Sequence, residues 1–588
     1  MDPYEQCLAH LSETDRSTYL ALLAPGSDID HRGTHFNGLL VDVLLDAMRD
    51  PLTGNPRIGS AQFSGATFSG AARFQDATFS AEAYFENAAF HTLACFQDAN
   101  FRNHARFSGA TFSNGARFDG TVFSTESRFV LATFSAQVLF KGAVFSGEAI
   151  FTSATFDAKA WFVDAVFSAK ARFQGATFLA DVWFHGATFA ADAEFGVARF
   201  STLAVYAKAA FSTDASFAGA RFESAKQLGP LVCGGTLDLS EAQFGCPLTI
   251  VAAARKVVCQ RTRWGATAVL RLRYATVDLS DAVVEYPLSI ASRLPSRPVR
   301  GDRTLDESPL AGRDTGVRIV SLSGIDAAHL ILTDVDLTEC QFSGTIHLDH
   351  LRLEGNCTFT LTPAGLHWQG RRPIRWTPRR TLAEEHHWRA ARGAVGWTPA
   401  PAHMDPPGPR TLAPVYRQLR KAFEDGKNEP DAADFYYGEM EMRRHDTARP
   451  RAERALLAMY WAISGYGLRA SRALGWLLLA MAATVLAMML WGLPKDDPKP
   501  KSAGTLDGQR ITMTTDTPDP VNPDEPYRER LSTERFEKSL LVVINSVVFR
   551  SSGQELTTVG TYTEMVSRIS EPVLLGLAAL AIRGRVKR

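Results

Sequence analysis

Four adjacent residues, Glu384, Glu385, His386 and His387, are the strongest candidates in this sequence for metal or acid–base chemistry. Imidazole and carboxylate groups bind zinc, and a zinc-binding helix places two histidines four residues apart so that both lie on one face. Here the two histidines are direct neighbours. We therefore interpret the run as a solvated group of charges and predict no metal site in it.

The cysteines and the glycine-rich segments point away from catalysis as well. The seven cysteines are odd in number and scattered, and none forms a Cys-x-x-Cys pair, which favours a reducing compartment. The sequence contains neither a dinucleotide-binding glycine motif between a strand and a helix nor a phosphate-binding loop with its lysine. We predict no catalytic residue, no cofactor and no enzymatic activity, and the polar start of the sequence shows no secretory signal.

Phenylalanine dominates residues 58–222 with a regular spacing. The aromatic residues follow one another at alternating steps of five and six, and a small residue, usually alanine, stands two positions before each. On a helix these steps would scatter the aromatic side chains around the axis, and a flat strand would alternate with a period of two. The pattern predicts a solenoid in which two eleven-residue units form one coil, and successive coils lie about 4.8 Å apart.

The inward side chains of this solenoid are predicted to be its core. They include Phe68, Phe79, Phe90, Phe101, Phe112, Phe123, Phe134, Phe145, Phe156, Phe167, Phe178, Phe189 and Phe200. Trp161 and Trp183 each stand one residue before an inward aromatic, so they are expected to face outward at the same place on successive coils. Such a pair of exposed tryptophans predicts a small binding patch.

The unit Ala66-Thr67-Phe68-Ser69-Gly70 and its many copies resemble the pentapeptide-repeat family. The resemblance implies a right-handed quadrilateral β-helix. We expect an N-terminal helical cap at residues 1–57 and the regular β-helix at 58–225. An irregular continuation of the β-helix, with leucine inside and an inserted loop, is expected at 226–361, and a linker at 362–410.

The last third of the chain is predicted to be helical and to enter a membrane. A helical hairpin with a basic juxtamembrane helix covers 411–472, and a membrane module covers 473–588. The module is expected to begin with a transmembrane helix at 473–493 and an outer loop at 494–535. A re-entrant helix at 536–549 and a second membrane helix at about 564–583 follow. Arginines before the first crossing and a basic tail after the second place the solenoid and the C-terminal tail in the cytoplasm. The layout is similar to that of bacterial pentapeptide-repeat membrane proteins.

A short segment between the last two helices resembles an ion-selective filter. Thr557, Thr558, Val559 and Gly560 match the start of the potassium-channel filter, in which backbone carbonyls from four chains replace the water around the ion. The resemblance implies a two-helix pore module in a homo-oligomer. The match ends after Gly560, where Thr561 stands in place of the filter tyrosine.

These observations predict a membrane-anchored cytoplasmic scaffold that binds protein partners along its solenoid and carries a channel-like, degenerate pore module. One alternative is a functional cation channel with a regulatory β-helix. Another is a topoisomerase-binding mimic of DNA, because some pentapeptide-repeat proteins resemble acidic B-DNA. Residues 58–222 contain 13 acidic and 12 basic residues, and the whole chain has 63 of each. The field is therefore too weak for mimicry, and no nucleic-acid partner is expected.

Overall fold

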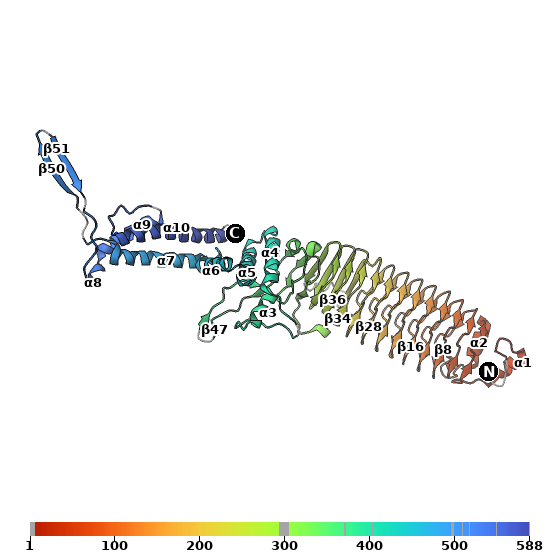
Figure 1. Ribbon diagram of the computed structural model, residues 1–588. Helices are drawn as coiled ribbons and strands as arrows, with labels where there is room; N and C mark the ends of the chain where they lie inside the picture. The colour runs from red at the N-terminus through yellow and green to blue at the C-terminus, as the bar shows by residue number, and fades with distance from the viewer. Residues whose placement is uncertain are drawn as a thin grey trace, which may run out of the picture. The chain divides into compact units, whose positions relative to one another are not determined.

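The computed structural model describes residues 6–292, 305–369, 372–402, 404–495, 499–508, 510–516, 518–548 and 550–586. The chain divides into two compact units. The first unit contains Met1–Pro407 and Lys421–Gly426, and the second contains Gly408–Arg420 and Lys427–Arg588. The predicted fold class is confirmed, because the first unit is a parallel β-solenoid of about 13 turns and the second is helical (Figure 1).

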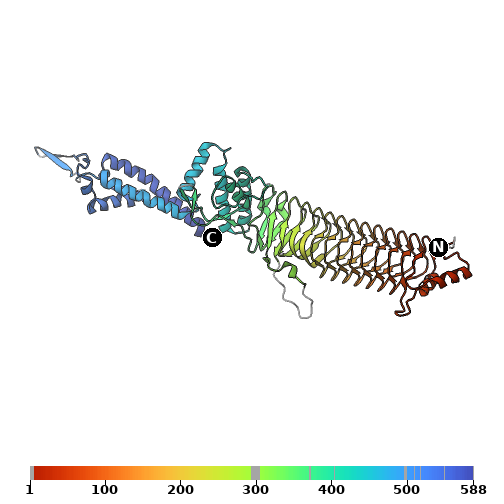
Figure 2. The same ribbon diagram turned by 90° about the horizontal axis from the view of Figure 1, so that it is seen from below.

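Each regular coil of the solenoid has four very short strands. The first complete set is β4 (Ala61–Gln62), β5 (Thr67–Phe68), β6 (Ala72–Arg73) and β7 (Thr78–Phe79). They pair in parallel with β8 (Ala83–Tyr84), β9 (Ala89–Phe90), β10 (Ala94–Cys95) and β11 (Asn100–Phe101), so that Ala61 lies opposite Ala83, 22 positions later. Figure 2 shows the resulting coils from below as a row of stacked loops.

Four columns of stacked phenylalanine rings fill the interior. The thirteen phenylalanines predicted for the core are at most 1% exposed. Phe145, for example, lies between Phe123 and Phe167 with ring centroids 4.9 Å and 4.8 Å away and nearly parallel rings. Alanine at the first position of many strands is equally buried and leaves room for the rings. Stacked aromatic pairs add about 0.5–1.5 kcal/mol each beyond the burial of their area.

The eleven-residue period comes from the corners. In every eleven residues one corner residue has left-handed backbone, as at Gly65, Asp76, Asn87 and Asp98, whose φ angles are +67°, +58°, +55° and +54°. Glycine adopts this conformation freely, and asparagine and aspartate adopt it at low cost. Each of these residues lies in a five-residue step between aromatics. The six-residue steps pass the next corner without a left-handed residue, except at Gly115. Two different corners therefore make one repeating unit.

The coils become less regular after residue 226. Strands lengthen to β34 (Gln227–Asp238) and β36 (Leu248–Val258), and Leu248 pairs with Ala268, so the coil shortens to 20 residues. The later strands are β38 (Ala268–Arg273), β39 (Thr276–Asp278), β41 (Leu288–Ser292), β42 (Val317–Ser321), β43 (Leu330–Thr333), β44 (Val335–Asp336) and β45 (Arg352–Glu354). Leu237, Leu239 and Leu279 are fully buried inside these coils, and Phe244 and Trp264 continue one aromatic column.

The solenoid begins earlier than the repeat predicts. β1 (Ile29–Asp30) pairs with β4, and β2 (His35–Phe36) pairs with β5, so a coil already exists before residue 58. The ring of Phe36 stacks on Phe68 with centroids 5.1 Å apart. Helix α1 (Glu13–Leu22) precedes this coil and α2 (Gly38–Ala47) is inserted into it. The insertion breaks the spacing of five and six, which hides the first coil in the sequence.

The described part of the inserted loop packs against the side of the solenoid. Its short 3₁₀ helix η1 (Ser308–Leu310) buries Leu310 completely, and this side chain clusters with Val232 and Ala253 on the outside of β34 and β36. Residues 293–304 of the same predicted loop lie outside the described residues. The segment from 305 therefore covers an apolar outer surface.

The second unit is built from helices. They are α5 (Glu429–His445), α6 (Arg451–Ser464), α7 (Ala470–Ala487) with its π-helical end η4 (Met488–Gly492), α8 (Tyr527–Arg530), α9 (Thr533–Val547) and α10 (Thr558–Val586). Helix α4 (Pro409–Asp425) contributes residues to both units. Two stretches, Ala470–Gly492 with 23 residues and Thr558–Arg583 with 26 residues, are long and apolar enough to cross a membrane. The second begins earlier than the predicted residue 564.

The predicted outer loop contains a hairpin of its own. β50 (Lys501–Asp507) pairs in antiparallel fashion with β51 (Arg510–Asp516). Gly508 has φ +66° at the turn, which a tight hairpin turn requires. The predicted re-entrant helix corresponds to α9, which has 15 residues and buries Ser539, Val542 and Val543.

Candidate functional site

A row of apolar side chains faces outward on one column of the solenoid. It lies on β18 (Val138–Leu139), β22 (Ala160–Trp161), β26 (Val182–Trp183) and β30 (Ala204–Val205). In each strand the first residue is buried and the second is half-buried on the outside. The parallel register places Leu139 beside Trp161, Trp161 beside Trp183, and Trp183 beside Val205. We call these four outward residues the tryptophan ladder.

The two indole rings of the ladder form a stack. Their centroids are 4.0 Å apart and their planes differ by 12°. The ammonium of Lys159 lies 5.6 Å from the Trp183 ring, within range of a cation–π interaction. Earlier coils of the same column present Arg73, Cys95 and Arg117 at this position, so the apolar character begins only at Leu139. Aromatic surface of this kind anchors partner proteins at interfaces.

The filter-like segment has a helical backbone. Thr557 is buried just before α10, and the helix begins at Thr558. The Thr557 hydroxyl donates a hydrogen bond to the carbonyl oxygen of Trp491 at 2.7 Å and accepts one from the Gly560 amide at 3.2 Å. Thr557 therefore caps the start of α10 and ties it to η4.

The carbonyl groups of this segment are engaged within the helix. The Thr561 amide donates to the Thr557 carbonyl oxygen at 2.9 Å, and the Thr563 hydroxyl donates to the Val559 carbonyl oxygen at 2.7 Å. A selectivity filter needs extended backbone whose carbonyls face an ion. Gly560 has a packing role instead, because a Cβ on it would lie 2.3 Å from the carbonyl oxygen of Gly492.

The interpretation of Glu384–His387 as a solvated charge run is wrong. These residues belong to helix α3 (Ala383–Ala391), and all four are buried. Glu384 Oε1 accepts hydrogen bonds from the backbone amides of Phe342 at 2.9 Å and Ser343 at 2.7 Å. These amides belong to a late coil, so Glu384 satisfies donors that the end of the solenoid would leave open. The segment predicted to be a linker thus contains a cap for the solenoid.

A buried ion network holds this C-terminal cap together. Both oxygens of Glu385 accept from Arg379 Nη2, at 2.6 Å and 2.7 Å, and Glu385 Oε1 also accepts from Arg389 Nε at 2.6 Å. The Arg389 guanidinium lies 4.9 Å from the ring of Trp397. Burial lowers the pKa of His386 to about 4, so this imidazole is neutral at physiological pH. Loss of one partner would leave a buried charge uncompensated, so these groups depend on one another for their place in the cap.

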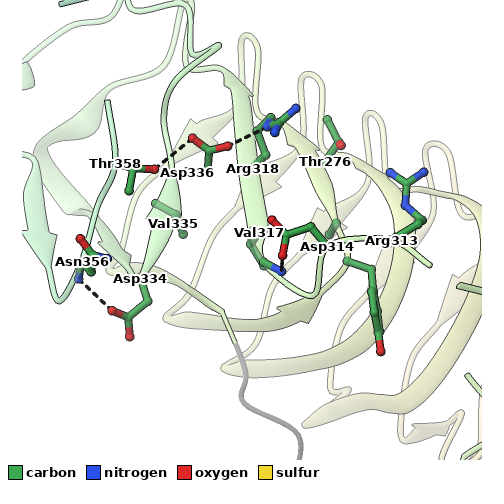
Figure 3. A pocket seen from close by; sticks show the side chains of 13 residues that line it. Thr276, Arg313, Asp314, Val317, Arg318, Asp334, Val335, Asp336, Asn356 and Thr358 are labelled. Atoms are coloured by element: carbon green, nitrogen blue, oxygen red, sulfur yellow. Dashed lines mark hydrogen bonds and ion pairs between the residues drawn. The ribbon is translucent and has the colours of Figure 1, made fainter. Parts of the chain in front are cut away.

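One cavity of about 340 Å³ lies on the outside of the late coils (Figure 3). Asp336 stands at its centre and pairs with Arg318 Nε at 2.8 Å and with the Thr358 hydroxyl at 3.1 Å. Asp334 accepts the amide of Asn356 at 2.8 Å. Figure 3 shows these pairs side by side. Asp336 and Arg318 neutralise each other, so this part of the cavity is a polar groove without a free charge.

Six of the seven cysteines lie where burial raises the pKa of the thiol. All seven are free thiols, and Cys233, Cys259, Cys340 and Cys357 are buried. Burial raises the pKa of Cys233 to about 11, so the nucleophilic thiolate is not populated at neutral pH. Among the residues that the structure describes, no group of three or more histidine, cysteine, aspartate or glutamate side chains is placed to hold a metal ion.

Comparison with known proteins identifies the repeat. Segments 58–95, 96–144, 129–177, 140–188 and 151–199 match the family model described as pentapeptide repeats in nine copies. All of these segments lie in the regular coils that carry the four phenylalanine columns and the start of the tryptophan ladder. No curated protein and no solved structure matches the chain.

Proposed function

We propose that this protein is a membrane-anchored scaffold whose pentapeptide-repeat solenoid holds a partner protein against the tryptophan ladder. The observation that carries the proposal is the outward stack of Trp161 and Trp183. Inward and corner residues of a solenoid are required by the fold, whereas the outward residue of each strand is free to vary. Four successive outward positions that are apolar therefore indicate a surface used for binding.

The ladder limits the shape of the partner. Its four side chains span three coil spacings, or about 14 Å. This length matches a short extended segment or one face of a helix that carries a row of aromatic or branched apolar side chains. Lys159 beside Trp183 adds a positive charge, which favours a carboxylate at one end of the partner segment.

The two apolar helices support attachment to a membrane. Their lengths of 23 and 26 residues exceed the roughly 20 that a bilayer core requires. Six arginines between residues 443 and 469 precede the first of these helices, and Arg472 lies in its first turn. This distribution favours a cytoplasmic solenoid by the positive-inside rule. The capping role of Thr557 and the packing role of Gly560 favour an anchor over an ion-conducting pore.

A photo-crosslinking experiment tests the scaffold. The full chain is expressed in its own cells with p-benzoylphenylalanine at Leu139, at the edge of the ladder, or at Arg117, one coil earlier in the same column. We expect a defined protein adduct from position 139 that disappears when Trp161 and Trp183 are both changed to serine. Equal adducts from position 117, or adducts that survive the serine substitutions, would contradict the proposal.

Alkaline carbonate extraction tests the anchor separately. The full chain should stay in the membrane pellet, and a chain that ends at residue 465 should be released. A full-length protein found in the carbonate supernatant would refute membrane attachment. It would leave the crosslinking result at the ladder standing.

A further inference from the structure

A basic pocket lies where α5 ends and α6 begins. Its volume is about 520 Å³, and its lining consists of Arg444, His445, Arg451, Arg454, Ala455 and Ala458. Four of these six residues are basic, and no carboxylate is among them. Arg454 Nε donates to the carbonyl oxygen of Arg444 at 3.4 Å, which brings the two arginines together across the bend between the helices.

The nearby carboxylates neutralise only part of this pocket. Glu439 forms ion pairs with Arg417, Arg420 and Arg443, at 3.5 Å, 3.1 Å and 3.6 Å. Glu453 pairs with Arg449 at 2.5 Å, and the same arginine reaches Asp446 at 3.6 Å.

The last carboxylate in this part of the chain is also engaged. Glu441 is buried, accepts from the Tyr466 hydroxyl at 2.9 Å and pairs with Arg444 at 2.9 Å. Its Oε2 also lies 3.9 Å from His445 Nδ1. Within the part of the chain that the structure describes, Arg451 and Arg454 have no carboxylate partner. Two positive charges are therefore left open at one pocket.

The pocket has two further features that suit an anion. The Arg444 guanidinium lies over the Trp461 ring, 4.6 Å from its centroid, and this contact restricts its movement. The pocket is also at the N-terminal end of α6, where the first backbone amides point out of the helix and no described side chain caps them.

The exposed surface of α6 indicates where the anion comes from. Leu456 and Met459, which directly follow the pocket-lining Ala455 and Ala458, are 61% and 55% exposed. A helix with arginines at its start and exposed apolar side chains beyond them is typical of helices that lie in a membrane interface. Basic pockets next to membrane helices bind the phosphate of anionic lipid head groups.

We propose that the pocket formed by Arg444, His445, Arg451 and Arg454 binds a phosphate group, which is supplied by an anionic lipid head group or by a free phosphate compound. Arginine presents several N–H donors in a planar fork that matches phosphate oxygens. Only the lipid source rests on the proposed membrane attachment. Binding of a free phosphate compound requires the pocket alone.

Two measurements on the full-length chain distinguish the sources. The first is calorimetric titration of detergent-solubilised protein with inorganic pyrophosphate. The second is native mass spectrometry of protein released from nanodiscs that contain phosphatidylcholine with or without cardiolipin. Pyrophosphate binding without cardiolipin enrichment assigns a free phosphate compound, and cardiolipin enrichment assigns a lipid. Either outcome supports a phosphate-binding pocket, and binding in neither arm overturns it.

Matched variants locate the binding. The double change Arg451→Gln and Arg454→Gln should weaken binding about thirtyfold, because two basic groups at an anionic site are lost. Arg410→Gln with Lys427→Gln removes the same charge elsewhere in the second unit, at two exposed side chains, and should change binding less than twofold.

A charge-preserving variant guards against misfolding. Arg451→Lys with Arg454→Lys should keep most of the affinity, because the positive charges remain. Glutamine variants that bind as tightly as the unchanged chain, or control variants that lose as much affinity, would show that the pocket is not the site. Release of the full-length chain into the carbonate supernatant, together with pyrophosphate binding, would refute the anchor and leave the pocket in place.

Discussion

The phenylalanine columns predict a large and local effect for Phe145→Ala. Phe145 is fully buried and stacks on Phe123 and Phe167 at 4.9 Å and 4.8 Å. Removing a phenylalanine from a core costs about 3–5 kcal/mol through lost transfer energy and the cavity that remains. Both stacks are lost in addition to the buried area, so we expect about 4 kcal/mol near the middle of this range. The loss should be concentrated in the coils on either side of residue 145, because each coil contacts only its neighbours.

Hydrogen exchange of the full chain measures this effect coil by coil. The amides of Ser146 and Ser168 bond to the carbonyl oxygens of Phe123 and Phe145, both at 2.8 Å, so they report the coils that enclose the ring. A loss of 4 kcal/mol accelerates their exchange about a thousandfold. Val144→Ala, at the outward position of the same strand, should change exchange less than fivefold. An acceleration below tenfold for Phe145→Ala, or equal effects of the two variants, would contradict the inference that the Phe145 ring points inward and stabilises the solenoid.

Three further predictions concern a corner, the cap and a helix crossing. Val197 has left-handed backbone with φ +58° and is 72% exposed. Val197→Gly should therefore stabilise its coil by about 1–2 kcal/mol, measured as slower amide exchange, and Val197→Ala should stabilise it less. The cap helix α3 should lose stability as pH falls from 6.5 towards about 4, because the lowered pKa of His386 lets the unfolded state bind the proton first. Amide exchange of residues 383–391 against pH measures this loss, and a flat profile would contradict it. Gly560→Ala should destabilise the helix crossing at Gly492 by about 1–3 kcal/mol, measured by thermal unfolding. Gly576→Ala is the matched control and should not lower stability, because its Cβ would meet no described atom within 4 Å.

The regular coils could be predicted because every coil repeats the same local choices. An inward aromatic, a small residue two positions earlier and a left-handed corner recur in each eleven residues, so one unit predicts the next. The first coil could not be found in this way. Phe36 occupies the same column as Phe68, but the insertion of α2 separates them by 32 positions instead of 22. A periodicity test does not detect a repeat with a helix inside it.

The cap and the filter-like segment show two other limits of sequence analysis. From the sequence we expect Glu385 to be solvated, but Arg379 and Arg389 surround it once the chain folds. The i,i+4 spacing is compatible with the pair with Arg389, whereas the pair with Arg379 lies outside the helix and no spacing rule indicates it. The residue types of Thr557–Gly560 suit both the start of a helix and a selectivity filter. Threonine before a helix caps it, and threonine in a filter lines a pore, so the choice depends on the contact with Gly492 and not on the segment alone.

The tryptophan ladder separates the demands of folding from those of binding. Cross-strand pairs of side chains on a sheet contribute only about 0.2–1 kcal/mol each, so the stack of Trp161 and Trp183 adds little to a solenoid already held by four columns of phenylalanine. Threonine occupies many of the outward positions elsewhere, as at Thr111 and Thr133, and satisfies the fold there without exposing an aromatic ring. If the tryptophans served the fold, Trp183→Thr would lower the stability measured by amide exchange by several kcal/mol. The protein that still folds would then give the same yield of crosslink at Leu139 as the unchanged chain. Since they lie outside the core, we expect a change in stability below about 1 kcal/mol together with loss of the crosslink. That combination can arise only if the ladder is a surface for another molecule.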